Sequence, residues 1–254
     1  MPQAMFNLTG RMALVTGGSK GLGLAMARGL AEAGADLAIC SRNETELTAA
    51  RDAIAAATGR RVEAIVADMT RRADVRRLAD ESARRLGKID ILVNNAGTNV
   101  PQAIDAITDE TWDMMLELNL TSVMALTRAL VPGMKERQWG RVIHISSMMA
   151  TISKEKRNTY SATKAALIGM TRASALELGP FNITVNCLAP GPFLTDLPAS
   201  LLSQAERDEW SRVTALGRWG DPRELVGPLL LLASDAGSYI TGQSILVDGG
   251  FTVR

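Results

Sequence analysis

Short apolar segments alternate with longer helix-forming segments along this chain, and this alternation constrains its fold more than any other feature. The apolar segments, typical of buried strands, span 12–16, 36–40, 62–67, 89–93, 141–146, 183–188 and 244–247. The helix-forming segments span 21–33, 43–58, 71–86, 109–134, 158–178 and 223–233. Strands joined through helices run parallel, because a parallel pair needs a long crossover connection. We therefore expect an α/β fold with a parallel sheet wrapped by helices.

A glycine-rich turn, Thr16–Gly23, lies between the first predicted strand and the first predicted helix. Glycines at this place let the backbone turn tightly and approach a pyrophosphate, while the helix N-terminus offers free N–H groups. The turn favours a nucleotide site, and a plain tight turn is the alternative. The predicted cofactor contacts in it are Gly17, Ser19, Lys20, Gly21, Leu22 and Gly23.

The end of the second strand indicates which nucleotide would bind. A carboxylate there would hydrogen-bond the ribose 2′-hydroxyl of NAD, but the segment reads Cys40-Ser41-Arg42, and Asp36 comes too early. Arg42 and Lys20 are within reach of a 2′-phosphate. The sequence therefore favours NADP(H), with NAD(H) possible, and with Ser41 and Arg42 as contacts. The alternative is that both basic residues are solvated surface charges.

Polar and small residues follow the third and fourth strands. Asp68 is placed to accept a hydrogen bond from an adenine amino group, or else to cap the helix that begins near Arg71. The small residues of 94–97 leave room for the adenine ribose, although asparagine and glycine also form ordinary turns. The predicted contacts here are Asp68, Met69, Asn95, Ala96 and Gly97.

Tyr160 and Lys164 stand four residues apart in the helix predicted over 158–178, so they share one helix face. A protonated lysine near a phenol stabilises the phenolate and lowers the phenol pKa from about 10. Such a phenol can pass a proton to or from a substrate oxygen. On its own, this pair also arises by chance on solvated helices.

Together these motifs resemble the short-chain dehydrogenase/reductase family over essentially the whole chain. The matching pieces, in order, are Thr16–Gly23, Asp68, Asn94–Gly97, Asn119, Ser147, Tyr160, Lys164 and Pro190-Gly191. The resemblance implies a Rossmann-type doubly wound sheet of about seven parallel strands and a homotetramer or homodimer. It also implies an NAD(P)-dependent oxidoreductase that interconverts a carbonyl and a secondary alcohol by hydride transfer. A catalytically silent dinucleotide-binding sensor or scaffold is the alternative, and the complete set of four catalytic residues argues against it.

The resemblance implies a role for each of those four residues. Tyr160 would be the general acid in carbonyl reduction and the general base in alcohol oxidation. Lys164 would bind the nicotinamide ribose and, with the positive charge of the oxidised cofactor, lower the tyrosine pKa. Ser147, thirteen residues before the tyrosine, would orient the substrate oxygen, while its neighbour Ser146 would face the other way. The Asn119 side chain would hold a water that joins Lys164 to solvent.

The loop after the sixth strand carries the remaining predicted contacts, namely Pro190, Gly191, Phe193 and Thr195. The resemblance implies that this loop binds the nicotinamide carboxamide and fixes pro-S hydride transfer. The segment 192–213 is expected to be a substrate lid, with a surface helix as the alternative.

The substrate is less well defined. Lys154, Lys156 and Arg157 form a basic cluster just before Tyr160, which is either a site for an anionic substrate or a solvated charge run. Overall the chain is similar to gluconate 5-dehydrogenase-like or 3-oxoacyl-carrier-protein-reductase-like members of the family. The resemblance therefore suggests a sugar acid, a polyol or a 3-oxoacyl thioester.

Composition narrows the remaining possibilities. No linker, low-complexity tract or repeat divides the 254 residues, so we expect one domain over 1–254. A net charge of +1 gives no electrostatic reason to bind nucleic acid or an anionic membrane. There is no run of 18 apolar residues, and 1–9 lack the features of a signal peptide, which favours a cytoplasmic protein.

The chemistry-bearing residues Cys40, Cys187 and His144 lie in apolar, strand-like segments. Two free buried thiols fit this placement better than a disulfide. No His/Cys cluster has ligand spacing, so no metal is expected. The segment 247–250, at the end of the last strand, is a candidate for pairing between subunits.

Overall fold

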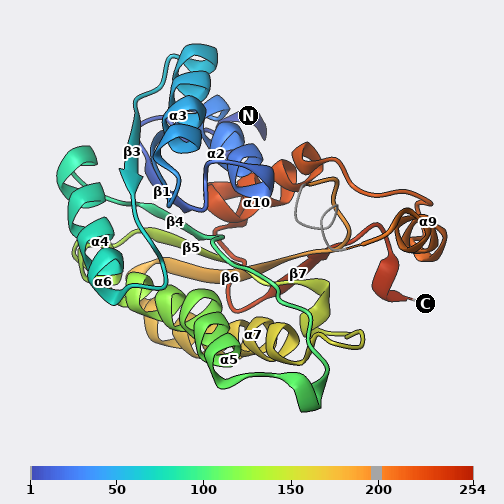
Figure 1. The fold of residues 1–254 in the computed structure, drawn as a ribbon. Helices are drawn as coiled ribbons and strands as arrows, with labels where there is room; N and C mark the ends of the chain where they lie inside the picture. The colour runs from blue at the N-terminus through green and yellow to red at the C-terminus, as the bar shows by residue number, and fades with distance from the viewer. Residues whose placement is uncertain (1, 196–201, 254) are drawn as a thin grey trace.

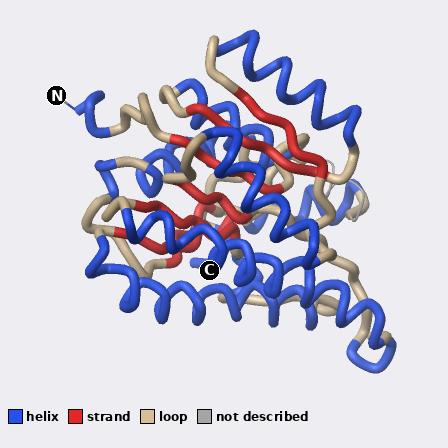
Figure 2. The backbone as a smooth tube through the Cα atoms, turned by 90° about the vertical axis from the view of Figure 1, so that its left-hand side faces the viewer, coloured by secondary structure: helices blue, strands red, loops and turns tan. Residues whose placement is uncertain are grey.

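The computed structural model describes residues 2–195 and 202–253. Seven parallel strands form one sheet in the order β3-β2-β1-β4-β5-β6-β7, with helices on both faces (Figure 1). The strands are β1 (Met12–Thr16), β2 (Asp36–Ser41), β3 (Val62–Val66), β4 (Ile91–Asn94), β5 (Gly140–Ile145), β6 (Ile183–Pro190) and β7 (Ser244–Val247). Figure 2 shows these strands running through the middle of the molecule between helical layers. The predicted doubly wound α/β fold is confirmed.

Two helical layers enclose the sheet. One face carries α2 (Gly21–Glu32), α3 (Glu44–Thr58) and α10 (Val226–Ala233), whose apolar side chains form one buried cluster with the sheet. The other carries α4 (Arg72–Leu86), α6 (Ser122–Glu136) and α7 (Asn158–Leu178). Three helices lie outside these layers, namely α1 (Pro2–Met5), α5 (Asp109–Leu116) and α9 (Gln204–Val213). Because the central strands β1, β4, β5 and β6 are buried along almost their whole length, their polar contacts with a ligand are confined to the strand ends.

The long helix predicted over 109–134 is interrupted where α5 meets α6. Residues Glu117–Thr121 form a π-helical turn, in which the Ser122 N–H donates to the Glu117 carbonyl five residues earlier. The extra residue rotates the first half of the helix relative to the second. Five apolar residues of this segment recur at steps of four and three, which predicts one buried stripe along a regular helix. Because of the π turn, Val123, Leu130 and Met134 are buried, but Leu116 and Leu120 are only half-buried. Asn119 faces inward instead.

The combined helix Asp109–Glu136 is long and apolar enough to cross a membrane, judged by length and composition alone. In this structure it packs on the sheet. Leu126 and Met134 belong to the buried cluster between α4, α6 and the strands. Its apolar character is therefore explained by the core of the fold.

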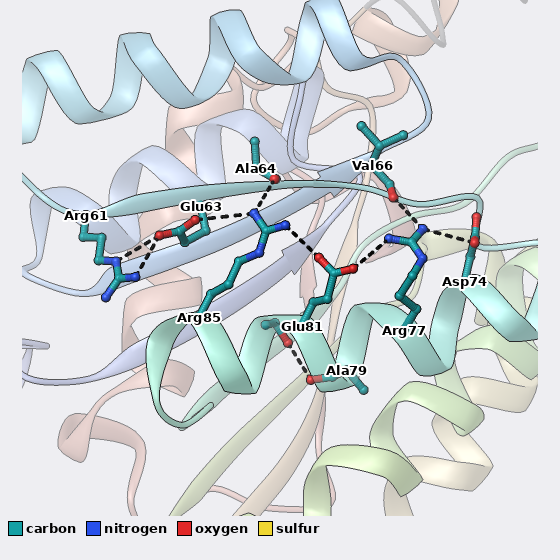
Figure 3. Close-up of polar contacts among 10 residues, drawn as sticks. Arg61, Glu63, Ala64, Val66, Asp74, Arg77, Ala79, Glu81 and Arg85 are labelled. Carbon is teal, nitrogen blue, oxygen red and sulfur yellow. Dashed lines mark hydrogen bonds and ion pairs between the residues drawn. The ribbon is translucent and has the colours of Figure 1, made fainter.

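Strand β3 is one edge of the sheet, and arginines of α4 cover it (Figure 3). Arg77 donates to the Val66 carbonyl at 2.8 Å and Arg85 to the Ala64 carbonyl at 3.3 Å. Glu81 accepts from both guanidinium groups, at 3.3 Å and 2.7 Å. Exposed ion pairs of this kind contribute only about 0–1 kcal/mol each. Their main effect here is to occupy carbonyl groups at an open sheet edge.

Candidate active site

A cavity of about 750 Å³ lies at the carboxyl ends of the strands. Its wall includes every residue predicted to contact a cofactor. Those residues are Gly17, Ser19, Lys20, Gly21, Leu22, Gly23, Ser41, Arg42, Asp68, Met69, Asn95, Ala96, Gly97, Tyr160, Lys164, Pro190, Gly191, Phe193 and Thr195. Ser147 also lines the cavity. The fold thus brings together segments that are far apart in sequence, in a space of the size that small-molecule sites occupy.

The glycine turn is held by contacts that leave no room for side chains. The Asn95 amide donates to the carbonyls of Thr16 and Gly17 at 2.8 Å and 3.2 Å, so it ties β4 to β1 as expected. A Cβ at Gly23 would lie 2.0 Å from the Gly17 carbonyl oxygen. Helix α2 begins without a side-chain cap from Lys20, so its first-turn N–H groups have no side-chain acceptor there. Such a helix N-terminus suits a phosphate group.

The far end of the cavity contains one charged residue that the sequence reasoning missed. Glu46 lines it beside Arg42, and its carboxylate lies 3.5 Å from the Lys20 ammonium. The residue stands in the first turn of α3, where the Asn43 side chain caps its N–H. Asparagine just before a helix-forming segment was the available signal, because an N-cap there places residues 44–46 at the strand end.

Asp68 does not cap α4, so the alternative suggested by its position is wrong. Its Oδ1 accepts from the N–H and the hydroxyl of Thr70, at 2.9 Å and 2.8 Å. The N-cap of α4 is Arg71, which makes no side-chain cap. The carboxylate is therefore held in a local turn at the cavity wall.

Helix α7 carries Tyr160 and Lys164 on one face, as predicted. The Lys164 Nζ lies 5.7 Å from the Tyr160 ring centroid and donates to the Ile145 carbonyl at 2.8 Å. The Ser147 hydroxyl hydrogen-bonds the phenol, whereas the Ser146 hydroxyl donates to the Lys164 carbonyl at 2.8 Å. The strand end therefore brings Ser147, and not Ser146, to the phenol.

Burial governs the electrostatics of this pair. Burial raises the pKa of Tyr160, and the hydrogen bond from Ser147 and the charge of Arg157 only oppose that rise. The predicted effect of Lys164 on the phenol pKa includes the charge of the oxidised cofactor, so it stays a prediction. The ammonium is itself desolvated, which lowers the pKa of Lys164 to about 8.

The buried ammonium gives a pH-dependent stability prediction. A lysine pKa of about 8 in the folded chain, against 10.5 unfolded, penalises folding below pH 8, and the penalty disappears as the pH rises to 10.5. The stability advantage of Lys164→Met over the wild type should therefore shrink by about 3 kcal/mol between pH 7.5 and pH 10.5. Denaturant unfolding at both pH values measures it. The exposed Lys156→Met is the control and should show a constant difference; a constant difference for Lys164→Met contradicts the prediction.

Asn119 is buried at the π turn and ties two elements together. Its Oδ1 accepts from the Thr98 N–H at 2.9 Å, and its Nδ2 donates to the Thr98 carbonyl at 2.9 Å and the Thr163 hydroxyl at 3.3 Å. Both amide N–H groups are thus used, whereas Oδ1 accepts one hydrogen bond and keeps a second lone pair, so the water-holding role of this side chain stays a prediction. A Cβ at Gly97 would lie 3.1 Å from Oδ1 and 3.4 Å from the Lys164 Nζ, so Asn119 does border the site.

The segment predicted as a lid is only partly described, because 196–201 fall outside the described residues. Its helix α9 contacts the chain just before Tyr160, where Glu206 pairs with Lys154 at 3.2 Å. Trp210 of α9 stacks on Trp219, with ring centroids 5.7 Å apart. The described part of the segment thus packs on the turn that precedes Tyr160, and the lid stays a prediction.

The other chemistry-bearing residues lie in the core. Cys40 and Cys187 are free and buried, and burial raises their pKa values to about 12 and about 11. His144 is a strand residue whose Nδ1 lies 3.1 Å from the Asn94 amide, and burial lowers its pKa to about 3. Among residues 2–195 and 202–253, no group of three His, Cys, Asp or Glu side chains is arranged to hold a metal.

A parallel sheet with a glycine turn, a large cavity at its carboxyl edge and a phenol beside a serine and a lysine defines the class of nicotinamide-dependent oxidoreductases. Comparisons with known proteins identify the family. A family model described as enoyl-(acyl carrier protein) reductase matches residues 17–252. Gluconate 5-dehydrogenase of Gluconobacter oxydans is 35% identical over 98% of this chain and 97% of its own length. The 3-oxoacyl-[acyl-carrier-protein] reductase FabG of Chlamydia trachomatis is 36% identical over 96% and 98%.

Among solved structures, a gluconate 5-dehydrogenase from Burkholderia cenocepacia in complex with NADP and tartrate superimposes with a TM-score of 0.95. It is 36% identical to this chain, and the match covers 100% of both. The chain belongs to the short-chain dehydrogenase/reductase family. It is an oxidoreductase that interconverts a carbonyl and an alcohol with a nicotinamide dinucleotide.

Proposed function

We propose that this protein uses NADP(H) to interconvert a carbonyl and a secondary alcohol on a small substrate that is a sugar acid, a polyol or a 3-oxoacyl thioester. The observation that carries the proposal is the Ser147, Tyr160 and Lys164 group on the wall of the cavity that the glycine turn also lines. Relatives with these activities, and a relative that binds NADP, support it.

The residues fit such a cofactor. The closely packed glycines, where a Cβ at Gly23 would meet backbone, allow a pyrophosphate to approach the uncapped start of α2. Arg42 and Lys20 would hold the 2′-phosphate, and Lys164 the nicotinamide ribose. The predicted contacts from Pro190 to Thr195 would hold the carboxamide. When bound, the cofactor supplies or accepts the hydride.

The chain supplies the proton and the orientation. In carbonyl reduction Tyr160 donates its Oη proton to the substrate oxygen, and in alcohol oxidation it takes that proton back. Ser147 donates a hydrogen bond to the same oxygen and holds it beside the phenol. The bond from Asn119 to Thr98 fixes the loop that faces the lysine. Burial raises the pKa of Tyr160, so in the absence of cofactor the phenol keeps the proton that reduction requires.

A silent dinucleotide-binding sensor is the less favoured candidate. Burying the Lys164 ammonium beside a phenol destabilises the fold, and a sensor has no use for that arrangement.

We also propose that the protein is a single-domain, cytoplasmic homotetramer with residues 192–213 as its lid. Two free buried cysteines support the compartment, and the exposed Leu176 of α7 and Leu246 of β7 support the assembly.

A substrate screen tests the proposal. Purified protein is assayed with sugar acids, polyols and 3-oxoacyl thioesters, with both cofactors in both directions, by following nicotinamide absorbance. We expect turnover with at least one class and higher kcat/KM with NADP(H) than with NAD(H). NADPH binding without turnover on any substrate would instead favour the sensor.

Cofactor preference depends on two opposing charges. Arg42→Ala should raise the Kd of NADPH roughly 10- to 100-fold and leave that of NADH within about twofold, since a charge-assisted bond to the 2′-phosphate contributes about 1.5–3 kcal/mol. Glu46→Gln should act in the opposite direction and tighten NADPH several-fold, because it frees the Lys20 ammonium for the phosphate. Fluorescence titration measures both constants. Equal loss of NADPH and NADH binding in Arg42→Ala would show that the arginine does not bind the 2′-phosphate that distinguishes the two cofactors.

A further inference from the structure

Arg157, at the N-cap of α7, is a buried side chain with a guanidinium nitrogen that no residue within 2–195 and 202–253 pairs with. Its exposed fraction is 7%, and its Nη1 is buried with no hydrogen bond. Within residues 2–195 and 202–253, no hydrogen bond or ion pair satisfies this side chain. Burying an unpaired charge is costly, so a guanidinium in this state calls for an anion that completes the site.

The other deeply buried arginine shows what a structural arginine looks like in this fold. Arg141 has an exposed fraction of 1%, and its guanidinium donates to the carbonyls of Ser234, Gly140 and Asn182. It also lies 3.5 Å from the Asp235 carboxylate. The fold therefore satisfies a buried arginine where its role is to hold elements together, which it does not do for Arg157.

The nearby acidic group is already committed to other donors. Glu206 of α9 acts electrostatically on Arg157 but makes no ion pair with it. Its Oε1 pairs with the Lys154 ammonium at 3.2 Å, and its Oε2 accepts from the N–H and hydroxyl of Ser203, both at 2.9 Å. Of the three basic residues in this cluster, Lys154 is thus neutralised and Lys156 is exposed to water. The unmet positive charge belongs to Arg157.

Arg157 lies beside the reacting group. It stands three residues before Tyr160 on α7, and its charge opposes the rise of the phenol pKa. Side chains at this helical spacing have Cβ atoms about 5–6 Å apart. Arg157 is not itself part of the wall of the large cavity, whereas Tyr160 is. A substrate with its carbonyl at the phenol would therefore have to extend beyond this wall to place an anionic group on Arg157.

Two unpaired acceptors come from the loop that follows β4. The Gln102 N–H donates to the Lys156 carbonyl at 3.1 Å, so this loop packs on the turn that carries Arg157. Gln102 Oε1 and Asn99 Oδ1 are both buried without a hydrogen-bond partner. Amide oxygens left in this state suit hydroxyl donors of a ligand. The loop after β4 thus carries two unmet acceptors, and its Gln102 contacts the turn that carries the unmet donor of Arg157.

We propose that Arg157 determines specificity by binding the carboxylate of a short polyhydroxylated acid, with Asn99 and Gln102 accepting from its hydroxyl groups. The inference rests on the proposed function, because it places the reacting carbonyl at Tyr160. A carboxylate satisfies the planar guanidinium with two parallel hydrogen bonds and cancels its charge. The favoured substrate class is thus an acid whose carboxylate lies a few carbon atoms from the reacting centre.

The test compares acid and neutral substrates matched in length on the NADP(H)-saturated enzyme. The pairs are D-gluconate with sorbitol, D-galacturonate with D-galactose, and levulinate with 2-pentanone. The wild type should prefer the acid in at least one pair. Arg157→Gln should lower kcat/KM for that acid roughly 10²- to 10³-fold and leave the neutral partner within about threefold. Arg157→Lys should recover part of the loss, and Lys156→Gln, at an exposed position in the same turn, should change neither.

Two results would overturn the inference while leaving the proposed function intact. One is a wild type that turns over neutral substrates with no preference for the acid in any pair. The other is an Arg157→Gln variant that loses activity on acid and neutral partners equally, since a purely structural arginine would affect both. Thermal unfolding and NADPH binding of each variant show whether the fold is retained. A wild type that turns over nothing while binding NADPH counts against the proposed function, and with it the inference.

Discussion

Replacing Tyr160 with Phe should lower kcat roughly 10³- to 10⁴-fold while the Kd of NADPH stays within about fivefold. The substitution removes the Oη proton and the partner of the Ser147 hydroxyl but keeps the ring in place. General acid catalysis by a positioned side chain contributes up to about 10⁴ in rate, and here no neighbouring group can replace it. The Lys164 ammonium is directed at the Ile145 carbonyl, so it is poorly placed to donate instead. Steady-state kinetics and fluorescence titration measure the two quantities.

The chain contains its own control for this substitution. Tyr239 is the second of only two tyrosines, and it is fully exposed. Tyr239→Phe should therefore behave as the wild type in both assays. If Tyr160→Phe keeps more than a tenth of wild-type turnover, the phenol is not the proton donor and another group in the cavity must serve.

Replacing Gly23 with Ala should raise the Kd of NADPH at least about 100-fold and lower the free energy of unfolding by about 3 kcal/mol. The new methyl group would lie 2.0 Å from the Gly17 carbonyl oxygen and 2.6 Å from the Asn95 Nδ2. Neither atom can move freely, because one is backbone and the other holds two carbonyls of the same turn. The turn must open, which displaces the N–H groups meant for the pyrophosphate. In a chain of this size the melting temperature should fall by about 6–12 °C.

Gly227→Ala is the matched control, because a Cβ at this helical glycine meets nothing within 4 Å. It should leave NADPH binding unchanged and stabilise the fold by up to about 1 kcal/mol, since alanine favours the helix. Wild-type NADPH affinity in Gly23→Ala would mean that the cofactor does not approach the backbone of this turn.

Local signals explain most of what could be predicted from the sequence. Each strand is a short apolar run between helices, and the Asn43 cap and the glycine turn depend on neighbouring residues only. The Ser147, Tyr160 and Lys164 spacing identified the site because these residues lie on one strand end and the helix that follows it. The π turn at Glu117–Thr121 could not be predicted in this way, since neither glycine nor proline marks it.

Properties that depend on tertiary burial were also out of reach. The sequence suggested an acidic phenol, yet in the protein alone burial raises its pKa. Lys154, Lys156 and Arg157 looked equivalent as a basic run. They differ only because of how α9 and the loop after β4 pack on them: Lys154 pairs with Glu206, Lys156 is exposed, and Arg157 has an unsatisfied nitrogen. Glu46 was missed for the same reason, because only the fold brings α3 beside Lys20.

The two edge strands of the sheet, β3 and β7, differ in whether arginine side chains occupy their outward backbone carbonyls. With guanidinium groups on the Ala64 and Val66 carbonyls, an incoming strand would have to displace two bound donors before it could add to β3. Strand β7 forms the opposite border, and in the part of the chain that the structure describes no arginine donates to its carbonyls. An added strand is therefore opposed at the β3 edge by bound donors that, among the described residues, are missing at the β7 edge.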